Sequence, residues 1–314
     1  MISNLRLGMF ACLIGWLVPS SLLAEPPKRV LLVTHSGGFI HDSVGVAEEV
    51  LKEIGPRHGL AVTCYRFTGD PEKPIKFRPA KGAPEIEQKW LEKYSDDFRK
   101  RTGMTVESAN IGRINANTLK QFDLVLFFTT GSQRNQQSPL NETELADLLA
   151  WVKAGGAFAG THCATDTLYD SPYGDLIGGY FAGHPWHQKI RLKVESPNHP
   201  AAAGFDNGAE ITDEIYQFNP NGPYSREKLH IILSVDNQSI DVSKGKRPDQ
   251  DYAIAWCHQY GKGKVFYTSL GHRKEVWNDP RFQSHLIGGL KWALGQVPGD
   301  ATPSAKLAAN KPGS

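Results

Sequence analysis

Residues 155–167 constrain the fold of this chain more than any other stretch. The segment reads Gly-Gly-Ala-Phe-Ala-Gly-Thr-His-Cys-Ala-Thr-Asp-Thr, so a short apolar run at 157–160 passes through a glycine into a polar turn. This pattern predicts a buried strand ending in a sharp turn, which lifts the turn side chain out of the edge of a sheet. We expect His162 to be the lifted residue, with Cys163 beside it and Asp166 one helical turn further on.

Two other apolar runs, residues 29–34 and 122–128, are each followed by a polar segment that contains glycine. Continuous Val, Leu and Phe runs are typical of parallel strands covered on both faces. Asp42 or Ser43 can cap a helix after the first run, and Asn141 can cap one after the second. The remaining expected elements are helices at 44–54, 85–101, 142–154 and 282–294, and strands at 60–67, 190–194, 231–235, 252–257 and 264–268.

The composition is that of an ordinary globular protein, with a formal charge of +2, 40% hydrophobic and 22% charged residues. It indicates no nucleic-acid surface. Residues 1–24 have the charge and apolar order of a secretory signal, with cleavage expected after Ala24, so the predicted location is the periplasm or outside the cell. No other stretch is long and apolar enough to span a bilayer, so we expect no stable membrane insertion after cleavage.

One domain is expected over residues 25–295, with an insertion at about 69–118 that begins with several prolines. Residues 296–314 are rich in Pro, Ala, Gly and Lys and are predicted to be a disordered tail. After signal cleavage three cysteines remain, and this odd number argues against a disulfide framework.

A series of ordered motifs then points to a family. They are residues 38–43 (GFIHDS), 127–131 (FFTTG), 155–167, 176–181 (LIGGYF), 183–188 (GHPWHQ), 198–200 (NHP), 213–216 (DEIY), 260–272 (YGKGKVFYTSLGH) and 277–280 (WNDP). Together they resemble the ThuA-like, trehalose-utilisation family over about residues 30–295.

The resemblance implies a flavodoxin-like α/β fold of the class I glutamine amidotransferase type, with a mostly parallel sheet and helices on both faces. It also implies a role in the metabolism of trehalose-like sugars, because the family tends to accompany sugar dehydrogenases that make 3-keto sugars. The amidotransferases carry a cysteine at the elbow where this chain has His162, and Cys163 is offset by one position. This departure argues against glutamine hydrolysis by a cysteine nucleophile.

Histidines dominate the candidate site. His35, His41 and His162 are expected at neighbouring strand ends, and His184 and His187 would share one face of a helix. Such a set can bind a divalent metal, act without metal as general acid and base, or hold a glycan. The candidate catalytic residues are His162, His41, His184 and Asp166, the last as the group that orients an imidazole. The candidate substrate-binding residues are Trp186, His187, Tyr216, Glu214 and His272. The metal ligands, if a divalent metal is bound, are His35, His41, His162 and His184.

We therefore expect an exported enzyme that acts on glycosides or 3-keto-glycosides by lyase or hydrolase chemistry, with a small carbohydrate as its substrate. A non-catalytic carbohydrate-binding protein is the first alternative, and a cysteine-dependent hydrolase of the amidotransferase type is the second. The sequence leaves open the sugar, the metal and whether the chain forms a homo-oligomer.

Overall fold

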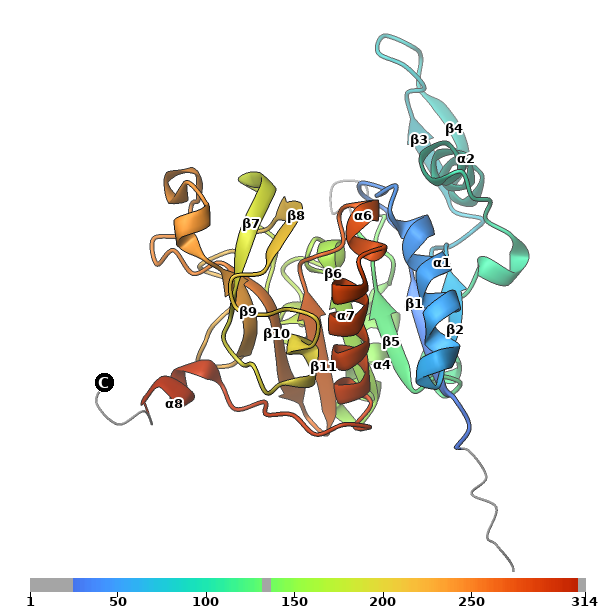
Figure 1. The fold of residues 1–314 in the computed structure, drawn as a ribbon. Helices are drawn as coiled ribbons and strands as arrows, with labels where there is room; N and C mark the ends of the chain where they lie inside the picture. The colour runs from blue at the N-terminus through green and yellow to red at the C-terminus, as the bar shows by residue number, and fades with distance from the viewer. Residues whose placement is uncertain (1–24, 132–136, 310–314) are drawn as a thin grey trace, which may run out of the picture.

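Nine strands form one continuous sheet in the computed structural model, which describes residues 25–131 and 137–309 (Figure 1). The strand order is β2-β1-β5-β6-β11-β10-β9-β7-β8. The expected signal peptide, residues 1–24, lies outside the described residues. No helix in the described ranges is long and apolar enough to cross a membrane.

The first five strands in this order run parallel to one another. They are β2 (Leu60–Tyr65), β1 (Lys28–Val33), β5 (Leu124–Phe127), β6 (Ala157–Thr161) and β11 (Gly263–Thr268). In β1, Val30 and Leu32 enter one hydrophobic core, whereas Leu31 and Val33 enter the other. Both faces of the parallel strands are therefore covered, which confirms the flavodoxin-like α/β fold.

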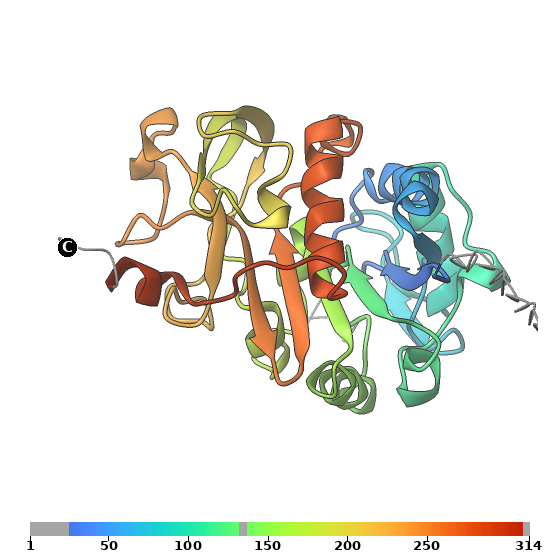
Figure 2. The same cartoon turned by 60° about the horizontal axis from the view of Figure 1, so that its bottom comes forward.

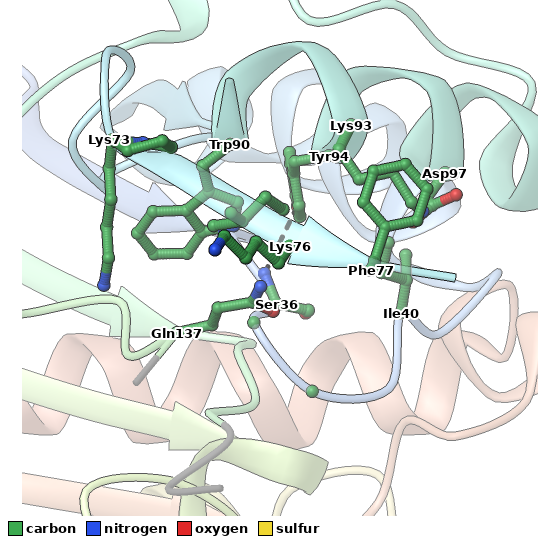
Figure 3. Close-up of a pocket in the computed structure, with 14 residues that line it drawn as sticks. Ser36, Ile40, Lys73, Lys76, Phe77, Trp90, Lys93, Tyr94, Asp97 and Gln137 are labelled. Carbon is green, nitrogen blue, oxygen red and sulfur yellow. Dashed lines mark hydrogen bonds and ion pairs between the residues drawn. The ribbon is translucent and has the colours of Figure 1, made fainter. Parts of the chain in front are cut away.

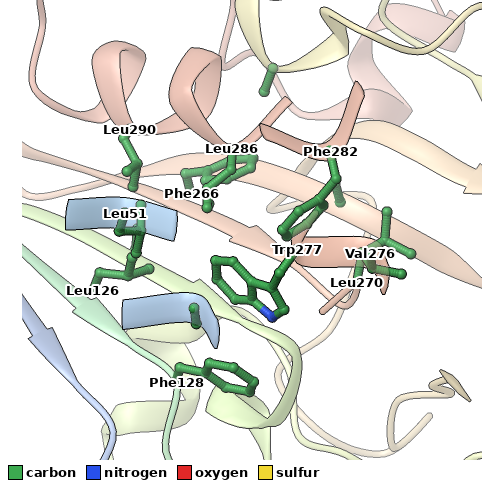
Figure 4. Close-up of a cluster of buried hydrophobic side chains, with 14 of the residues drawn as sticks. Leu51, Leu126, Phe128, Phe266, Leu270, Val276, Trp277, Phe282, Leu286 and Leu290 are labelled. Carbon is green, nitrogen blue, oxygen red and sulfur yellow. The ribbon is translucent and has the colours of Figure 1, made fainter. Parts of the chain in front are cut away.

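Helices cover the two faces of this parallel part. α1 (Val44–Ile54) and α7 (Pro280–Ala293) contribute to one core, and α4 (Glu142–Lys153) contributes to the other. Figures 1 and 2 show α7 and α4 on opposite sides of the sheet. On the α7 side, Trp277 stacks on Phe128 with a ring-centroid distance of 5.4 Å, within a cluster of large apolar side chains (Figure 4).

The N-terminal residues of α4 and α1 behave differently: one caps its own helix, and the other bonds to a distant loop. Asn141 accepts a hydrogen bond from the backbone of Glu144 and completes a capping box at α4, as the sequence predicts. Ser43 stands at the N-cap of α1, but its hydroxyl donates to the carbonyl of Gly271 instead of capping the helix. This bond ties the start of α1 to the loop after β11.

The other four strands are antiparallel to their neighbours: β10 (Ala253–Tyr260), β9 (His230–Val235), β7 (Trp186–Val194) and β8 (Glu210–Ile215). β7 pairs with β9 only through Leu192–Val194, while its residues 186–191 pair with β8. The first part of β7 and all of β8 therefore form a two-stranded ribbon that extends beyond the pairing of β7 with β9. The sequence patterns did not predict β8, because Glu-Ile-Thr-Asp-Glu-Ile mixes acids into a short strand.

The insertion after β2 has its own structure. β3 (Pro74–Phe77) and β4 (Ile86–Lys89) form an antiparallel hairpin, and α2 (Trp90–Thr102) follows directly. The predicted helix at 85–101 begins five residues late because residues 86–89 pair with β3. Trp90, Tyr94 and Phe98 point from α2 into the core, so the helix is only partly exposed.

The C-terminal segment differs from the expected disordered tail. The carbonyl of Thr302 accepts a hydrogen bond from His230, and the hydroxyl of Ser304 accepts one from the backbone of Ile231. Residues 302–304 therefore lie against the start of β9, where these bonds offset the entropic cost of ordering a polar segment. The remaining helices are α3 (Ala116–Leu119), α5 (Tyr173–Ile177), α6 (Lys274–Trp277) and α8 (Ser304–Ala309). Single turns of 3-10 helix occupy Gly55–His58, Ser108–Asn110, His162–Thr165, Pro200–Ala202, Asn237–Ser239 and Val242–Lys244.

Candidate functional site

Four potential metal ligands meet at one edge of the sheet. His41, His162, Glu214 and His272 each place one ligand atom in a group whose atoms all lie within 4.8 Å of one another. His41 follows β1, His162 follows β6, His272 follows β11 and Glu214 lies near the end of β8. Four antiparallel pairings lead from β11 to β8, so β8 runs in the same direction as the parallel strands. All four residues thus belong to the carboxyl ends of strands, where open α/β sheets usually bind ligands.

His162 sits at the sharp turn that the sequence predicts. Its φ is 45°, a left-handed conformation that is uncommon outside glycine. The Tyr267 hydroxyl donates to the His162 carbonyl at 2.6 Å, and the imidazole Nδ1 lies 2.9 Å from the Ser269 carbonyl oxygen. Because a carbonyl can only accept, Nδ1 carries the proton and Nε2 keeps a lone pair that faces the group.

Three donor atoms form a nearly regular triangle. His162 Nε2 lies 3.2 Å from His272 Nδ1 and 3.5 Å from Glu214 Oε2, and the last two are 3.3 Å apart. Metal bonds of about 2.0–2.1 Å in a tetrahedron separate neighbouring ligand atoms by about 3.3–3.4 Å. The triangle therefore has the dimensions of one face of a tetrahedral metal site.

His41 closes the group from the side of β1. Its ring centroid lies 4.8 Å from that of His162 and 5.2 Å from that of His272. Burial, together with the neighbouring imidazoles of His162 and His272, lowers the pKa of His41 to about 2. Its buried Nδ1 has no hydrogen-bond partner among the described residues. A neutral imidazole with an unsatisfied nitrogen fits a metal-binding role, because metals need the deprotonated ring.

Glu214 supplies negative charge to this cluster of imidazoles. Burial opposes its ionisation, but the adjacent imidazoles of His162 and His272 outweigh burial and hold its pKa well below the usual range. The same carboxylate raises the pKa of His272 against the opposing effect of burial. The second oxygen, Oε1, lies 3.3 Å from Nδ1 of His184, whose side chain is 53% exposed. Glu214 is therefore ionised and connects the buried group to an accessible histidine.

Asp213 holds the loop that carries His272. Its fully buried carboxylate accepts hydrogen bonds from the backbone of Gly271 at 2.7 Å and of Arg273 at 3.1 Å. The carbonyl of Gly271 accepts from Trp277 and from Ser43. The position of His272 is thus fixed by contacts from β8, α6 and the start of α1.

Some of the predicted site residues lie elsewhere. His35 was a candidate metal ligand, but it lies outside the group of four and its Nδ1 pairs with Thr68 at 2.9 Å. It is buried among the rings of Phe67, Trp90 and Tyr94. The strand pattern places His35 just after β1 but does not reveal that its side chain points into these rings.

Asp166 was expected to orient an imidazole, but its carboxylate accepts a hydrogen bond from Tyr169 instead. The carbonyl of Ser269 orients His162. The sequence cannot indicate this partner, because every residue has a backbone carbonyl group.

His184 and His187 are not on a helix. His184 precedes β7, and His187 lies within it, opposite Glu214 in the β7–β8 register. His187 is exposed, and its ring lies 5.1 Å from that of His272. Both residues therefore flank the group, on its solvent side.

Two of the candidate substrate-binding residues, the aromatic ones that could stack on a sugar ring, are buried. Trp186 is 1% exposed and Tyr216 is 2% exposed. The Trp186 indole donates to the carbonyl of Asp241, and Tyr216 packs on the His162 ring at 4.4 Å. Their faces are already covered by protein, so neither can stack on a sugar in this conformation.

The Cys163 thiol is not in a reactive state. It is fully buried, and burial raises the pKa of its thiol well above the ordinary value. All three cysteines of the described chain are free and buried, which agrees with the expected lack of a disulfide framework. Glu214 and His272 are candidate substrate-binding residues in the sequence. The β7–β8 ribbon brings Glu214 to His162, whereas His272 follows β11, which pairs directly with β6.

Comparison with known proteins identifies the family. The ThuA family model, described as trehalose utilisation, matches residues 29–293. A crystal structure of a ThuA-like protein from Bacteroides uniformis is 16% identical with a TM-score of 0.57, and the match covers 92% of this chain and 99% of that one. A ThuA-like protein from Parabacteroides merdae is 17% identical with a TM-score of 0.55, over 88% and 95% of the two chains. At these identities the two structures support the fold alone. A search of curated protein sequences finds no significant match. Because the family model spans nearly all of the described chain, this protein belongs to the ThuA, trehalose-utilisation family.

Proposed function

We propose that this protein is an exported, metal-dependent enzyme that cleaves glycosides or 3-keto-glycosides by lyase or hydrolase chemistry. The observation that carries the proposal is the convergence of His41, His162, Glu214 and His272 within 4.8 Å. Three imidazoles and one carboxylate suit a divalent metal such as zinc. Family membership supports a carbohydrate substrate, and the apolar order of residues 1–24 supports export.

The four residues would hold the metal, which would supply a Lewis acid that polarises a sugar carbonyl or hydroxyl. The hydrogen bond from His162 Nδ1 to Ser269 keeps Nε2 available as a ligand. The buried setting of His41 and His162 excludes water from the inner side of the group.

We propose that His184 moves a proton. Its Nδ1 lies 3.3 Å from Glu214 Oε1, and a proton held on Nδ1 beside that carboxylate would leave Nε2 as an acceptor on an exposed side chain. Cleavage beside a ketone needs a base that removes the activated C–H proton and an acid that protonates the leaving oxygen. We assign the base role to His184 and the acid role to the exposed His187, which faces Glu214 across the ribbon.

The test combines metal content with turnover. The protein without residues 1–24 is analysed by inductively coupled plasma mass spectrometry and assayed on a panel of 3-keto-disaccharides before and after chelation. We expect about one metal ion per chain and turnover that chelation abolishes. Glu214→Gln keeps the size of the side chain but removes its charge, and should lower metal affinity by at least about 100-fold.

His58→Ala is the matched control, since His58 is a surface histidine at the end of the 3-10 turn Gly55–His58. It should retain metal and turnover. Turnover without metal would replace the metal-dependent mechanism by imidazole acid–base catalysis. Sugar binding with neither metal nor turnover would favour the carbohydrate-binding alternative.

A further inference from the structure

A cavity of about 620 Å³ lies beneath the insertion, away from the proposed reacting groups. The β3–β4 hairpin and α2 form its roof, with Phe77 and Trp90, and the loop 36–40 forms its floor (Figure 3). Its lining contains none of the four potential metal ligands, and neither His184 nor His187. The contacts that hold a sugar against these histidines therefore belong to another part of the chain.

The segment that follows His162 offers such contacts. The chain leaves the 3-10 turn at Asp166, and two backbone hydrogen bonds hold it there. The carbonyl of Thr165 accepts from the backbone of Phe181 at 3.0 Å, and the carbonyl of Asp166 accepts from the backbone of Gly131 at 3.0 Å. The position of Asp166 is thus fixed between the loop after β5 and the segment that leads to β7.

The Asp166 side chain is partly exposed, although its neighbours Thr165 and Thr167 are fully buried. The Tyr169 hydroxyl donates a hydrogen bond to Oδ1 of Asp166 at 2.5 Å. The other oxygen, Oδ2, has no hydrogen-bond partner among residues 25–131 and 137–309. A partly buried carboxylate oxygen without a donor is suited to accept a hydrogen bond from a ligand.

The Asp166 carboxyl lies near the group of four. Burial raises its pKa, and smaller contributions come from the charges of His162, Glu214 and His184. Such charges act strongly only within about 10 Å at moderate ionic strength. The carboxyl therefore shares this end of the sheet with the proposed metal ligands and the proposed base.

The loop around Asp166 is held in a strained conformation. Leu168 and Asp170 have φ values of 50° and 53°, which residues other than glycine rarely adopt. The Ser171 hydroxyl donates to the carbonyl of Leu168 at 2.5 Å, and the Tyr169 ring stacks on that of Tyr180 at 5.1 Å. Strain of this kind persists where the surroundings enforce it, and it is common at ligand-binding sites. The same contacts hold the hydroxyl that donates to the carboxylate.

Phe181 provides an apolar surface in the same place. It is partly exposed, and its ring lies 5.9 Å from that of the exposed His184 with an angle of 17° between the ring planes. The buried Tyr216 packs on Phe181 at 4.3 Å and on His162 at 4.4 Å, so one ring separates Phe181 from the group. A sugar presents both C–H groups and hydroxyls, which match an aromatic ring and a carboxylate.

We propose that Asp166 and Phe181 form a sugar-binding subsite beside the group of four. Oδ2 of Asp166 accepts a hydrogen bond from one hydroxyl of the sugar, and Phe181 contacts the C–H groups of the same ring. The inference rests on the proposed function and narrows its substrate class, because the sugar must carry a free hydroxyl at the position that faces Asp166.

Isothermal titration calorimetry tests the subsite with methyl α-D-glucopyranoside and its 2-, 3-, 4- and 6-deoxy analogues. A single ring is used so that each analogue lacks one defined hydroxyl. The protein without residues 1–24 is used as purified. We expect one deoxy analogue to bind at least about tenfold more weakly than the glucoside, as is usual for the loss of a hydrogen bond to a charged group.

Asp166→Ala should bind that analogue and the glucoside with equal affinity, because the partner of the missing hydroxyl has been removed. Such a cycle isolates the contact between the two groups from a general effect on the fold. Asp170→Asn is the control, because it removes an exposed acid from the same loop and asparagine tolerates the left-handed conformation. It should keep the hydroxyl preference of the parent protein.

Phe181→Ala should weaken the glucoside and all its deoxy analogues by the same factor, because the ring contacts C–H groups that every analogue retains. Thermal unfolding of each variant is followed in parallel. A loss confined to one analogue would contradict the role of Phe181.

Three results would overturn the proposal. They are the absence of binding by the parent protein, equal affinity of the parent for the glucoside and every deoxy analogue, and an unchanged hydroxyl preference in Asp166→Ala. The first two need no variant to fold. Binding is measured without turnover, so a protein that recognises the hydroxyl through Asp166 but cleaves no glycoside would overturn the proposed reaction and leave the subsite intact.

Discussion

His162 combines two features that rarely occur in one residue, a positive φ and complete burial. Strained backbone persists only where the surroundings hold it, and here Tyr267 and Ser269 bond to the backbone and side chain of His162. The cost of the conformation is offset by contacts that also fix the tautomer. Substitutions of the residues that hold the four potential metal ligands in place therefore give the most specific tests.

Asp213→Asn should weaken metal binding by about 10- to 100-fold, as is usual when an outer partner of a metal ligand is changed. The carboxylate accepts two backbone N–H groups of the His272 loop, and an asparagine would turn an NH₂ toward one of them. Metal affinity is measured by competition with a chromophoric chelator, and thermal unfolding is followed in parallel. Unchanged metal affinity in a destabilised variant would assign Asp213 a purely structural role.

Cys163→Ala should retain turnover within about twofold. Burial raises the pKa of this thiol, so it is not a thiolate at neutral pH and cannot act as a nucleophile. The variant loses packing, and we expect a destabilisation of about 1 kcal/mol. Steady-state kinetics on the keto-disaccharide panel measures the effect, and abolished turnover in a folded variant would revive the cysteine-dependent alternative.

The β7–β8 ribbon is the element that completes the site. It pairs with the rest of the sheet through only three residues of β7, and this short junction lets it carry Glu214 to His162. Sequence periodicity identifies the strands of the parallel part, since they are continuous apolar runs. It identifies β8 poorly, because the strand has only two isoleucines among three acids and a threonine, and the functional carboxylate is part of the strand itself.

The α4 cap gives a test at the scale of one helix. Asn141→Ala removes the side-chain bond to the Glu144 backbone and breaks the capping box. We expect the free energy of unfolding to fall by about 1 kcal/mol. Urea unfolding followed by circular dichroism measures the change. Asn117→Ala, at an exposed position inside α3, is the control and should be nearly neutral; an equal loss in both variants would contradict the capping role.

Across the whole molecule, several buried histidines make stability depend on pH. Burial lowers the pKa of His35 and of His199 to about 3 and that of His285 to about 4, from 6.5. Below pH 6.5 the unfolded chain takes up protons on these rings, whereas the folded chain does not until its own lower pKa values are reached. The free energy of unfolding should therefore be highest above pH 6.5 and fall as the pH drops toward 4.

Urea unfolding at a series of pH values between 4.5 and 7.5 tests this expectation. Each histidine contributes at most about 1.4 kcal/mol per pH unit. His285→Asn is informative because an amide can still donate to the carbonyl of Ala201 but does not titrate. This variant should show a shallower dependence than the parent, and an identical slope would remove His285 from the explanation.

The sequence by itself determined the parallel half of the sheet, the covering helices and the elbow at His162, because these depend on local apolar patterning and turn chemistry. It also identified most of the histidines of the site, since strand ends gather at one edge of an α/β sheet. Only the tertiary structure decided which of them meet. His35 turns into an aromatic cluster, while Glu214 and His272 reach His162 from segments 52 and 110 residues away along the chain. Glu214 arrives through the return of an antiparallel ribbon, His272 through the pairing of β11 with β6, and both depend on the direction of their side chains. None of these leaves a periodic signal in the sequence.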